Sequence, residues 1–413
     1  MIEFETGAAR PTASRRSQRS LDWFAFFVAN LQAGFGPFVA VYLTSESWTQ
    51  TDIGLLLTIG GVASLVLQLP GGAMVDATTA KKAIAAWSVA LVGLSALMLV
   101  MSTTFLVILL GWVLHAAASA TLTPALAATS LGLVGHDGVA RRFGRNASFA
   151  SAGNAIAAAV MGGIGYWVSN QAVFVVTAAL AVPALFALRG IASHEIDPHV
   201  SRGEDSEASG WEALWPLVTS KPLYTLFICM TLYFVGNAAL LPLIGSALTL
   251  RSEDSPTLFI AACIIAPQVL VTVLSPVVGA KAQSWGRKPL LLLAFSVLPI
   301  RAFGFAFIHD EYWLVLIQTL DGVSAAIIGV LVSVIVADAT RKTGHFALGQ
   351  SIVGIGMGLG SAISTLLGGF LADRLGSANA FIGLGSVAIL AFLVVLVAMP
   401  ETRPRLERRK AGQ

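Results

Sequence analysis

The chain has 413 residues, of which 56% are hydrophobic and only 11% are charged, whereas about a quarter of the residues in a soluble domain are charged. The formal net charge is +3, so the small basic excess gives no indication of nucleic-acid binding. This composition predicts a protein that crosses the membrane many times. Residues 1–20 are polar and basic without an apolar core, so we expect a cytoplasmic tail and no cleavable signal peptide.

A membrane-spanning helix needs roughly 20 apolar residues to cross about 30 Å of hydrocarbon. Twelve segments of the chain are long and apolar enough, and none has the alternation typical of a strand. In chain order they are 21–44, 51–76, 82–102, 105–133, 144–168, 171–190, 222–250, 256–282, 289–308, 312–338, 346–373 and 378–399. We therefore predict an all-α membrane protein with twelve transmembrane helices.

The basic residues predict the orientation of these segments. Twenty-two of the 25 Lys and Arg residues lie on the side that carries both termini. They are Arg10, Arg15, Arg16, Arg19, Lys81, Lys82, Arg141, Arg142, Arg145, Arg189, Arg202, Lys221, Lys281, Arg287, Lys288, Arg341, Lys342, Arg403, Arg405, Arg408, Arg409 and Lys410. Arg251 and Arg374 lie on the other side, and Arg301 lies within the ninth segment. Because cytoplasmic loops are enriched in Lys and Arg, we expect a protein of the inner (cytoplasmic) cell membrane with both termini in the cytoplasm.

The longest polar interruption, residues 191–220, falls at the midpoint of the chain. It is acidic and contains Pro, Gly and Ser, which predicts a cytoplasmic linker with a short amphipathic turn at EALWPLV. The domain organisation that follows is a tail at 1–20, a six-helix bundle at 21–190, the linker at 191–220, a second six-helix bundle at 221–399 and a tail at 400–413.

The two predicted bundles resemble each other in sequence. Aligning GGAMVDATTAKKA with VGAKAQSWGRKPL pairs Gly72 with Gly279, 207 positions later, and FGRNASFASAG pairs with LGQSIVGIGMG at an offset of 205. Since each half has six segments, both halves run in the same direction. This predicts two pseudo-symmetric bundles related by an axis along the membrane normal.

The paired loops between the second and third segments of each half carry the most specific pattern. The first holds Gly72, Asp76 and Lys81. The second holds four residues, namely Gly279, Gly286, Arg287 and Lys288. Glycines let two helices approach closely, and a carboxylate at Asp76 can accept hydrogen bonds from the N-terminus of a neighbouring helix. The alternative is that these basic loops only fix the topology.

On this loop pattern, the twelve segments and the repeat, the whole chain resembles the major facilitator superfamily, in particular its drug and metabolite transporters. The resemblance implies a loop that latches the outward-open state. The chain departs from the family pattern at Gln283, where Asp is usual, and at Ala77, Thr79 and Ala80. We therefore expect a weaker latch. Antiporters of this family often carry the signature Gly-Pro-x-x-Gly-Gly in the fifth segment. This chain keeps its last two glycines as Gly162 and Gly163 but has Ala158 and Ala159 in place of Gly-Pro.

Two ionisable residues lie deep within apolar segments. Asp321 stands 206 positions after His115, and both lie about 15 Å into the fourth segment of their half. By the resemblance, those segments line the central cavity, which predicts proton coupling by Asp321 and His115. Alternatively, Asp321 pairs with Arg301 in the ninth segment and His115 only hydrogen-bonds between helices.

Further polar residues occur on segments that, by the resemblance, line the cavity. The candidates for substrate binding are Asn30, Gln32, Asn154, Tyr233, Asn237, Gln268, Arg301 and Gln318. Gly and Pro interruptions in the first and seventh segments would allow these helices to bend. Each of these polar groups could instead serve only to join helices.

The sequence thus predicts a secondary active transporter that exports a small organic solute in exchange for protons. The alternative is a proton symporter or facilitator for uptake of an organic solute, including an anionic one that binds Arg301. A non-transporting receptor on the same fold is a more remote alternative. No phosphate-binding loop, hydrolase motif or metal-ligand cluster stands in the sequence. We accordingly expect neither an enzyme nor a cofactor, and a monomer whose partners are the lipid bilayer, the solute and protons.

Overall fold

A computed structural model of the chain describes residues 13–35, 37–202, 214–251, 256–341 and 343–403. Helices account for all the regular structure in these ranges. They are α1 (Arg15–Ala33), α2 (Pro37–Ser45), α3 (Gln50–Ala77), α4 (Lys81–Met101), α5 (Phe105–Trp167), α6 (Asn170–Ala179), α7 (Ala181–Arg189), η1 (Ser193–Glu195), α8 (Pro198–Arg202), α9 (Leu214–Thr219), α10 (Lys221–Asn237), α11 (Leu240–Arg251), α12 (Pro256–Trp285), α13 (Arg287–Phe307), α14 (Glu311–Thr319), α15 (Asp321–Ala339), α16 (Phe346–Leu375) and α17 (Ser377–Ala398).

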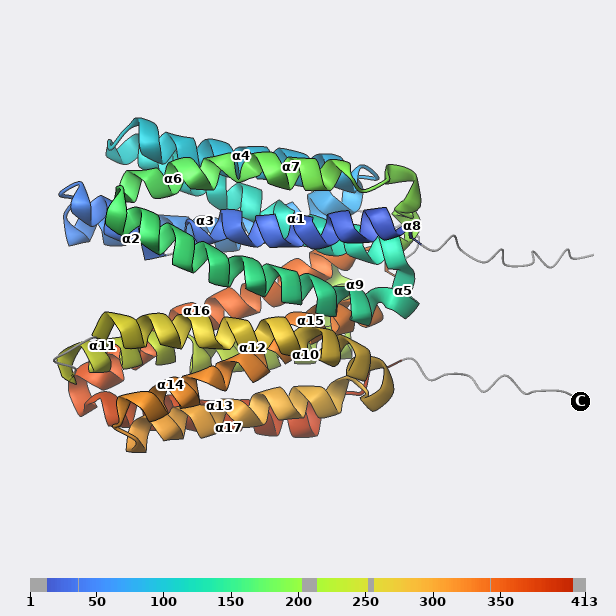
Figure 1. Cartoon of the computed structure of the whole chain (residues 1–413). Coiled ribbons are helices and arrows are strands. Elements are labelled where there is room, and N and C mark those ends of the chain that lie inside the picture. Colours follow the sequence, from blue (N-terminus) through green and yellow to red (C-terminus); the bar gives the residue numbers. More distant parts are fainter. Residues whose placement is uncertain (1–12, 36, 203–213, 252–255, 342, 404–413) are drawn as a thin grey trace, which may run out of the picture.

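Eleven helical stretches among the described residues, four of them made of two consecutive helices, are long and apolar enough to cross a membrane. One of them, α5, has 63 residues and contains two of the segments expected from the sequence, 105–133 and 144–168. Its helical geometry is broken at Gly135, which has φ 71° and ψ 177°, a conformation that only glycine adopts without strain. The chain of α5 turns back at the right-hand end of the molecule in Figure 1.

Four of the predicted segments are each divided into two helices. The breaks separate α1 from α2, α6 from α7, α10 from α11, and α14 from α15. Pro183 and Pro242 lie at the third position of α7 and α11, where a proline ring cannot donate the hydrogen bond that would continue the preceding helix. The break at Leu320 has no proline, and it places Asp321 in the first turn of α15.

The helices gather in two bundles, one formed by α1–α7 and the other by α10–α17 (Figure 1). The start of the expected linker is folded onto the first bundle: Val200 and Ser201 are buried, and Asp197 donates its backbone N–H to the Gly132 carbonyl at 3.0 Å. The part of the linker at 203–213 and most of the two tails lie outside the described residues.

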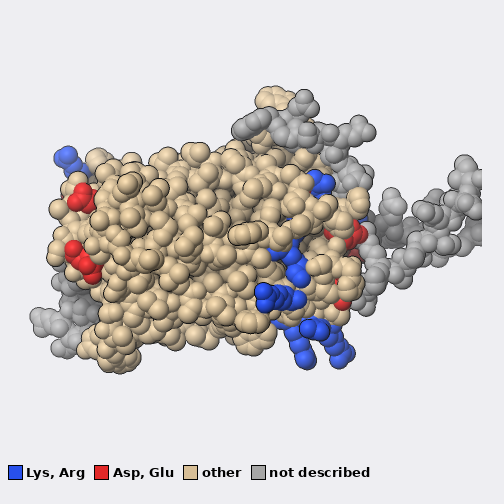
Figure 2. Space-filling view, turned by 90° about the horizontal axis from the view of Figure 1, so that it is seen from above, with Lys and Arg blue, Asp and Glu red and all other residues tan. Residues whose placement is uncertain are grey.

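The surface separates charged ends from an uncharged middle. Figure 2 shows a broad band without charged side chains, and Lys and Arg side chains clustered toward one end of this face. Many large apolar side chains are exposed, among them Trp87, Leu106 and Phe186. Such a surface is stable only against lipid, because a soluble protein rarely exposes a continuous apolar patch of this size.

Candidate functional site

The two bundles approach each other through glycines. A Cβ atom added at Gly72 of α3 would lie 2.8 Å from the Ala347 carbonyl of α16, and one at Gly279 of α12 would lie 2.5 Å from the Ala140 carbonyl of α5. The two glycines are 207 positions apart, and so are the two carbonyls. The offset of 207 that aligns the two loops in the sequence therefore also separates the two carbonyls that these glycines approach.

Beside the Gly72 contact, Asp76 crosses from one bundle to the other. Its carboxylate accepts the backbone N–H of Ala347 at 2.9 Å and that of Leu348 at 2.8 Å. Both groups belong to the first turn of α16, where unpaired N–H groups and the helix dipole favour a negative charge. Lys81, itself buried, donates to the Val75 and Asp76 carbonyls and so closes the end of α3.

The matching position in the other half holds a neutral group. The Gln283 side chain donates through Nε2 to the backbone carbonyl of Asp137, just before the Ala140 contact. Both loops therefore reach across to the opposite bundle. The Asp76 contact combines charge with two backbone donors, whereas the Gln283 contact is a single hydrogen bond between uncharged groups.

The basic end of the second loop is held within its own half. Arg287 donates to the Asp338 carboxylate at 3.0 Å and to the Ala282 carbonyl at 2.9 Å. The backbone N–H groups of Arg287 and Lys288 bond the Glu401 carboxylate, and Gly286, with φ 95°, packs against the same side chain. Among the described contacts, none made by Gly286, Arg287 or Lys288 reaches the other bundle.

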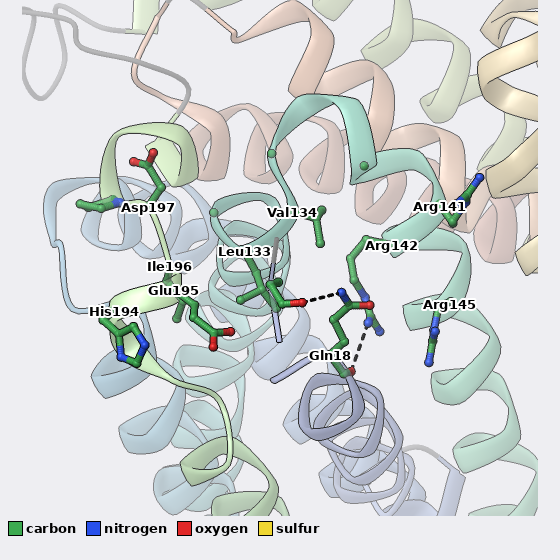
Figure 3. Close-up of a pocket in the computed structure, with 15 residues that line it drawn as sticks. Gln18, Leu133, Val134, Arg141, Arg142, Arg145, His194, Glu195, Ile196 and Asp197 are labelled. Atoms are coloured by element: carbon green, nitrogen blue, oxygen red, sulfur yellow. Dashed lines mark hydrogen bonds between the residues drawn. The ribbon is translucent and has the colours of Figure 1, made fainter. Parts of the chain in front are cut away.

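A further ionic network lies at the same end, inside the first bundle. Arg142 and Arg145 of α5 both pair with Asp22 of α1. Arg142 also donates to Asn146 at 2.9 Å and to the Gln18 carbonyl at 3.2 Å, and lines a cavity of about 680 Å³ (Figure 3). The network ties α1 to the second half of α5.

Glu195 reaches this cavity from the folded start of the expected linker. Partial burial raises the pKa of its carboxyl group, but hydrogen bonds from Ser17 and Ser14 outweigh this effect and hold the pKa below its ordinary value. The ionised carboxylate thereby fastens the segment before α1 to η1.

Asp321 and Arg301, which the sequence left as one of two alternatives, form an ion pair. The Arg301 side chain is 1% exposed and that of Asp321 is 25% exposed. Arg301 also lies over the Phe305 ring, 5.9 Å from its centre. The carboxylate is therefore the accessible member of a pair whose cation is buried.

Other polar groups of the second bundle remain partly unsatisfied in the described structure. Gln318 is 1% exposed, and its Oε1 has no hydrogen-bond partner, like the Nε of Arg301 and the Oδ1 of Asn237. Tyr233 is buried, and its ring lies 5.0 Å from that of Phe295. Because unsatisfied buried polar atoms cost free energy, a polar ligand or water that reached these atoms would be stabilised by them.

His115 lies in the other bundle, among aromatic rings. It stacks on Phe35 with ring centres 3.8 Å apart and planes inclined by 12°, and Trp112 lies 5.9 Å away. Its Nε2 is 3.4 Å from Ser119 Oγ, which also lies 3.4 Å from Gln32 Oε1. The His115 Nδ1 is buried and has no hydrogen-bond partner in the part of the chain that the structure describes. Within the described residues, no hydrogen bond or ion pair joins His115 to Asp321.

These groups line a cavity of about 400 Å³ between α1, α3 and α5. Its walls are Gln32, Phe35, Leu57, Gly60, Gly61, Ser64, Trp112, His115, Ala116 and Ser119. Of these, only Gln32 and His115 were candidates from the sequence. Trp112 and Ser119 share one helical face with His115, and this spacing was the available signal for them. The signal is weak, because an aromatic residue in an apolar helix does not stand out from its apolar neighbours.

The remaining candidates are dispersed. Asn30 donates to the Phe26 carbonyl of its own helix at 2.9 Å and is buried against Gly153. Gln268 binds the Ser151 hydroxyl across the bundles, through its side chain and through its backbone carbonyl at 3.0 Å. Asn154 is partly buried near Gly153 on α5. The structure thus joins Asp321 with Arg301, and His115 with Gln32, in separate bundles.

Comparison with known proteins agrees with this architecture. The family model of the Major Facilitator Superfamily matches residues 23–309 and 255–413. The chain therefore belongs to the Major Facilitator Superfamily and is a transporter of that type.

Several relatives share long stretches of the sequence. An MFS-type transporter of Mycobacterium tuberculosis is 38% identical over 393 residues, which cover 94% of each chain. The multi-drug resistance efflux pump PmrA of Streptococcus pneumoniae is 28% identical over 33% of this chain and 34% of its own. The quinolone resistance protein NorA of Staphylococcus aureus is 25% identical over 45% and 46%.

Solved structures share the fold at low sequence identity. The fucose:proton symporter FucP of E. coli aligns with a TM-score of 0.75 at 14% identity, covering 92% of this chain and 97% of its own. FucP in the outward conformation aligns with a TM-score of 0.73 at 15% identity and the same coverage.

Proposed function

We propose that this chain is a secondary active transporter that exports a small organic solute in exchange for protons. In this proposal twelve spans, two of them within α5, form two pseudo-symmetric halves in the cytoplasmic membrane, with both termini in the cytoplasm and the protein acting as a monomer. The observation that carries the proposal is the Asp321–Arg301 pair: a partly accessible carboxylate whose partner is a buried, fixed cation within spanning helices.

The pair supplies a mechanism for coupling. A proton that arrives at Asp321 removes the negative charge and leaves Arg301 buried without a counter-ion, which costs several kcal/mol. The protonated protein therefore favours a conformation or a ligand that compensates Arg301, and release of the proton reverses this preference. Alternating access then couples proton entry to solute exit.

The contacts at Asp76, Gly72 and Gly279 support a second part of the proposal, which is that the described conformation is closed at the cytoplasmic end. Asp76 acts as a latch from α3 to α16, with Lys81 closing the helix end behind it. Because the Gln283 contact is uncharged, the latch is weaker on that side. The cavity beside His115 is then the part of the solute path within the first half.

The efflux pumps PmrA and NorA favour export over uptake, since this chain resembles them over a third or more of its length. One observation favours the opposite direction. The Nε of Arg301 has no hydrogen-bond partner among the described residues, so an anionic solute could bind Arg301 and be taken up together with a proton, or through a facilitated route.

Transport in inside-out vesicles tests the proposal. A panel of radiolabelled amphipathic cations, neutral compounds and organic anions is offered with and without an imposed pH gradient. Export by proton antiport predicts accumulation inside the vesicles that depends on an acidic interior and stops when an ionophore dissipates the gradient.

Two variants decide the role of the carboxylate. Asp321→Asn should abolish the dependence on the gradient, and the double variant Asp321→Asn with Arg301→Gln should not restore it, although it removes the unpaired cation. Full gradient-driven accumulation by a folded Asp321→Asn protein would refute coupling through Asp321. Movement of organic anions alone, outward from the vesicles, would favour the uptake alternative.

A further inference from the structure

A third cavity, in the other bundle from the Asp321–Arg301 pair, opens beside α4 and α7. We call it the α4–α7 groove. It has a volume of about 1050 Å³ and lies where α4 begins and α7 ends, under the segment 193–198. Its lining residues are Thr79, Ala80, Lys81, Lys82, Ala83, Ala86, Trp87, Leu185, Leu188, Arg189, Ser193, His194, Ile196 and Pro198.

The rim of the groove is cationic, and among the described residues that line it none is Asp or Glu. Lys82 donates one N–H to the Ile191 carbonyl, which leaves two of the three donors of its ammonium group. Arg189 is exposed and lies over the Phe186 ring at 5.7 Å, so its planar guanidinium presents several donors at one edge. The rim therefore suits a phosphate group.

The wall of the groove is apolar and belongs to the spanning helices. Trp87, which is 71% exposed, lies six residues or about 9 Å along α4 from Lys81. Leu185 and Leu188 of α7 also line the groove. Tryptophan is favoured at the level of the lipid headgroups, so the wall continues from the rim toward the hydrocarbon layer.

The neighbouring cavity beside Arg142 differs in both respects. Its three arginines share the lining with Glu195 and Asp197 (Figure 3). Two of these arginines already pair with Asp22. A cationic rim above an apolar wall is thus particular to the α4–α7 groove among these two cavities.

We propose that the α4–α7 groove binds an anionic phospholipid of the cytoplasmic leaflet. The phosphate is held by Lys82 and Arg189, and an acyl chain lies along Trp87 and Leu185. A basic pocket between spanning helices is suited to such headgroups. A soluble phosphate compound would match the rim but would leave the apolar wall unused, which is why the lipid is the better occupant.

Binding to the purified full-length protein in neutral detergent tests this site. The ligand is dioctanoyl phosphatidylglycerol, and its apparent affinity is taken from the shift of the thermal unfolding midpoint during titration. The comparisons are dioctanoyl phosphatidylcholine and inorganic phosphate. We expect protection by phosphatidylglycerol that weakens with added salt, and little protection by either comparison compound.

Removing the rim charges should weaken this affinity about fivefold for each charge, and so roughly 25-fold in the double variant Lys82→Gln with Arg189→Gln. Arg141→Gln is the matched control, because Arg141 is an exposed arginine that lines the other cavity, and it should bind as the unaltered protein does. Equal affinity of the double variant and the control would overturn the site. Equal protection by phosphatidylcholine or by inorganic phosphate would overturn the anionic lipid as its occupant.

A second measurement does not depend on the Lys82 variant being folded. Arg189→Gln changes one exposed side chain and should lose the fivefold factor alone. Phosphatidylglycerol with brominated acyl chains should quench tryptophan fluorescence, and Trp87→Phe should remove a distinct part of that quenching. Unchanged quenching in Trp87→Phe would overturn the placement of the acyl chain.

Discussion

Arg301 and Asp321 pose a question of free energy, because each is unfavourable alone at this depth. A charged side chain within the hydrocarbon layer costs at least about 3 kcal/mol, and the pair removes most of this cost by mutual attraction. The first turn of α15 adds a favourable dipole at Asp321. A pair built this way holds its geometry only while the carboxylate is charged, which is the property that coupling requires.

Asp321→Asn should therefore destabilise the protein more than the double variant with Arg301→Gln. The single change leaves a buried guanidinium without its counter-ion and should lower the free energy of unfolding by about 3–5 kcal/mol, whereas removing both charges should recover most of that loss. Thermal unfolding in detergent measures both. A double variant less stable than the single one would mean that the pair is not the main partner of either side chain.

Gly60 determines the shape of the cavity beside His115. The Trp112 indole lies directly against its Cα, so that an added Cβ would overlap the ring, whereas Gly61 has open space at the same position. Gly60 thus sets where Trp112 stands in the cavity wall.

Gly60→Ala should displace Trp112 into the cavity and raise the KM of the transported solute about tenfold, with a smaller change in maximal rate. Gly54→Ala, on the same helix but outside the described lining of the cavity, is the control: an added Cβ there has no atom within 4 Å, and KM should stay within twofold. Concentration dependence of transport in vesicles separates the two. Equal KM values for both variants would mean that the cavity beside His115 is not on the solute path.

The helices α5 and α12 meet through reciprocal glycines. A Cβ at Gly279 would lie 2.5 Å from the Ala140 carbonyl, and one at Gly144 would lie 2.5 Å from the Ser275 carbonyl. Backbone carbonyls cannot rotate away as side chains can, so any larger residue must push the helices apart. These glycines therefore set how closely the bundles can pack at this end.

Gly279→Ala should open the end of the molecule that carries Asp76, because the clash is relieved only by backbone shifts worth typically 1–3 kcal/mol. Spin labels on Thr79→Cys and Ser284→Cys, exposed residues of the two matching loops, report the distance by double electron–electron resonance. We expect a longer-distance population. Gly162→Ala, on α5 with no atom within 4 Å, should leave the distribution unchanged.

The Asp76 contact should be the stronger of the two loop contacts. Asp76→Asn removes the charge at the α16 N-terminus and one of two acceptor oxygens, and losing a favourable charge–dipole contact costs up to about 2 kcal/mol. Gln283→Ala removes one neutral hydrogen bond, worth about 1 kcal/mol. The same label pair should therefore show a larger open population for Asp76→Asn, and the reverse order would contradict the asymmetry of the latch.

Much of this arrangement could be predicted from the sequence, and the rest had identifiable obstacles. Apolar length located the spanning helices, and the repeat offset of 207 anticipated the paired glycine contacts. The break at Leu320 could not be predicted, because no proline causes it and it coincides with the close approach of Gly322 to the Pro267 carbonyl of α12. The start of the linker was expected to be a polar connection, yet it folds onto the first bundle, where Val200 and Ser201 are buried and Ser201 packs against Gly132.

The candidate site shows the same limit. A charge in an apolar helix stands out, so Asp321 and Arg301 could be found, but whether they paired depended on the relative rotation of α13 and α15. Phe35 and Trp112 could not be found, because an aromatic side chain looks alike whether it faces lipid, the core or a cavity. What a sequence read alone leaves open is thus the direction in which an apolar residue points.

The distribution of charge over the entire molecule agrees with one orientation in the membrane. Lys and Arg cluster toward one end of the face in Figure 2. Asp76 stands just before Lys81 and Lys82, in a part of the sequence that the basic residues predict to be cytoplasmic. The orientation holds for both termini only if the number of crossings is even. The eleven candidate spans give an even number when α5 crosses twice.

Labelling from each side of the membrane should settle the path of α5. From Asp137 to Ser169 a helix would extend about 48 Å, longer than the roughly 30 Å hydrocarbon layer, and both residues are exposed. With the buried Cys229 and Cys263 replaced by Ala, a membrane-impermeant maleimide should label Ser169→Cys in intact cells and Asp137→Cys only in inside-out vesicles. Labelling of both from the same side would mean that the stretch after Gly135 does not cross. The chain would then make eleven crossings, and its termini would lie on opposite sides, which the clustering of basic residues at both ends of the sequence makes unfavourable.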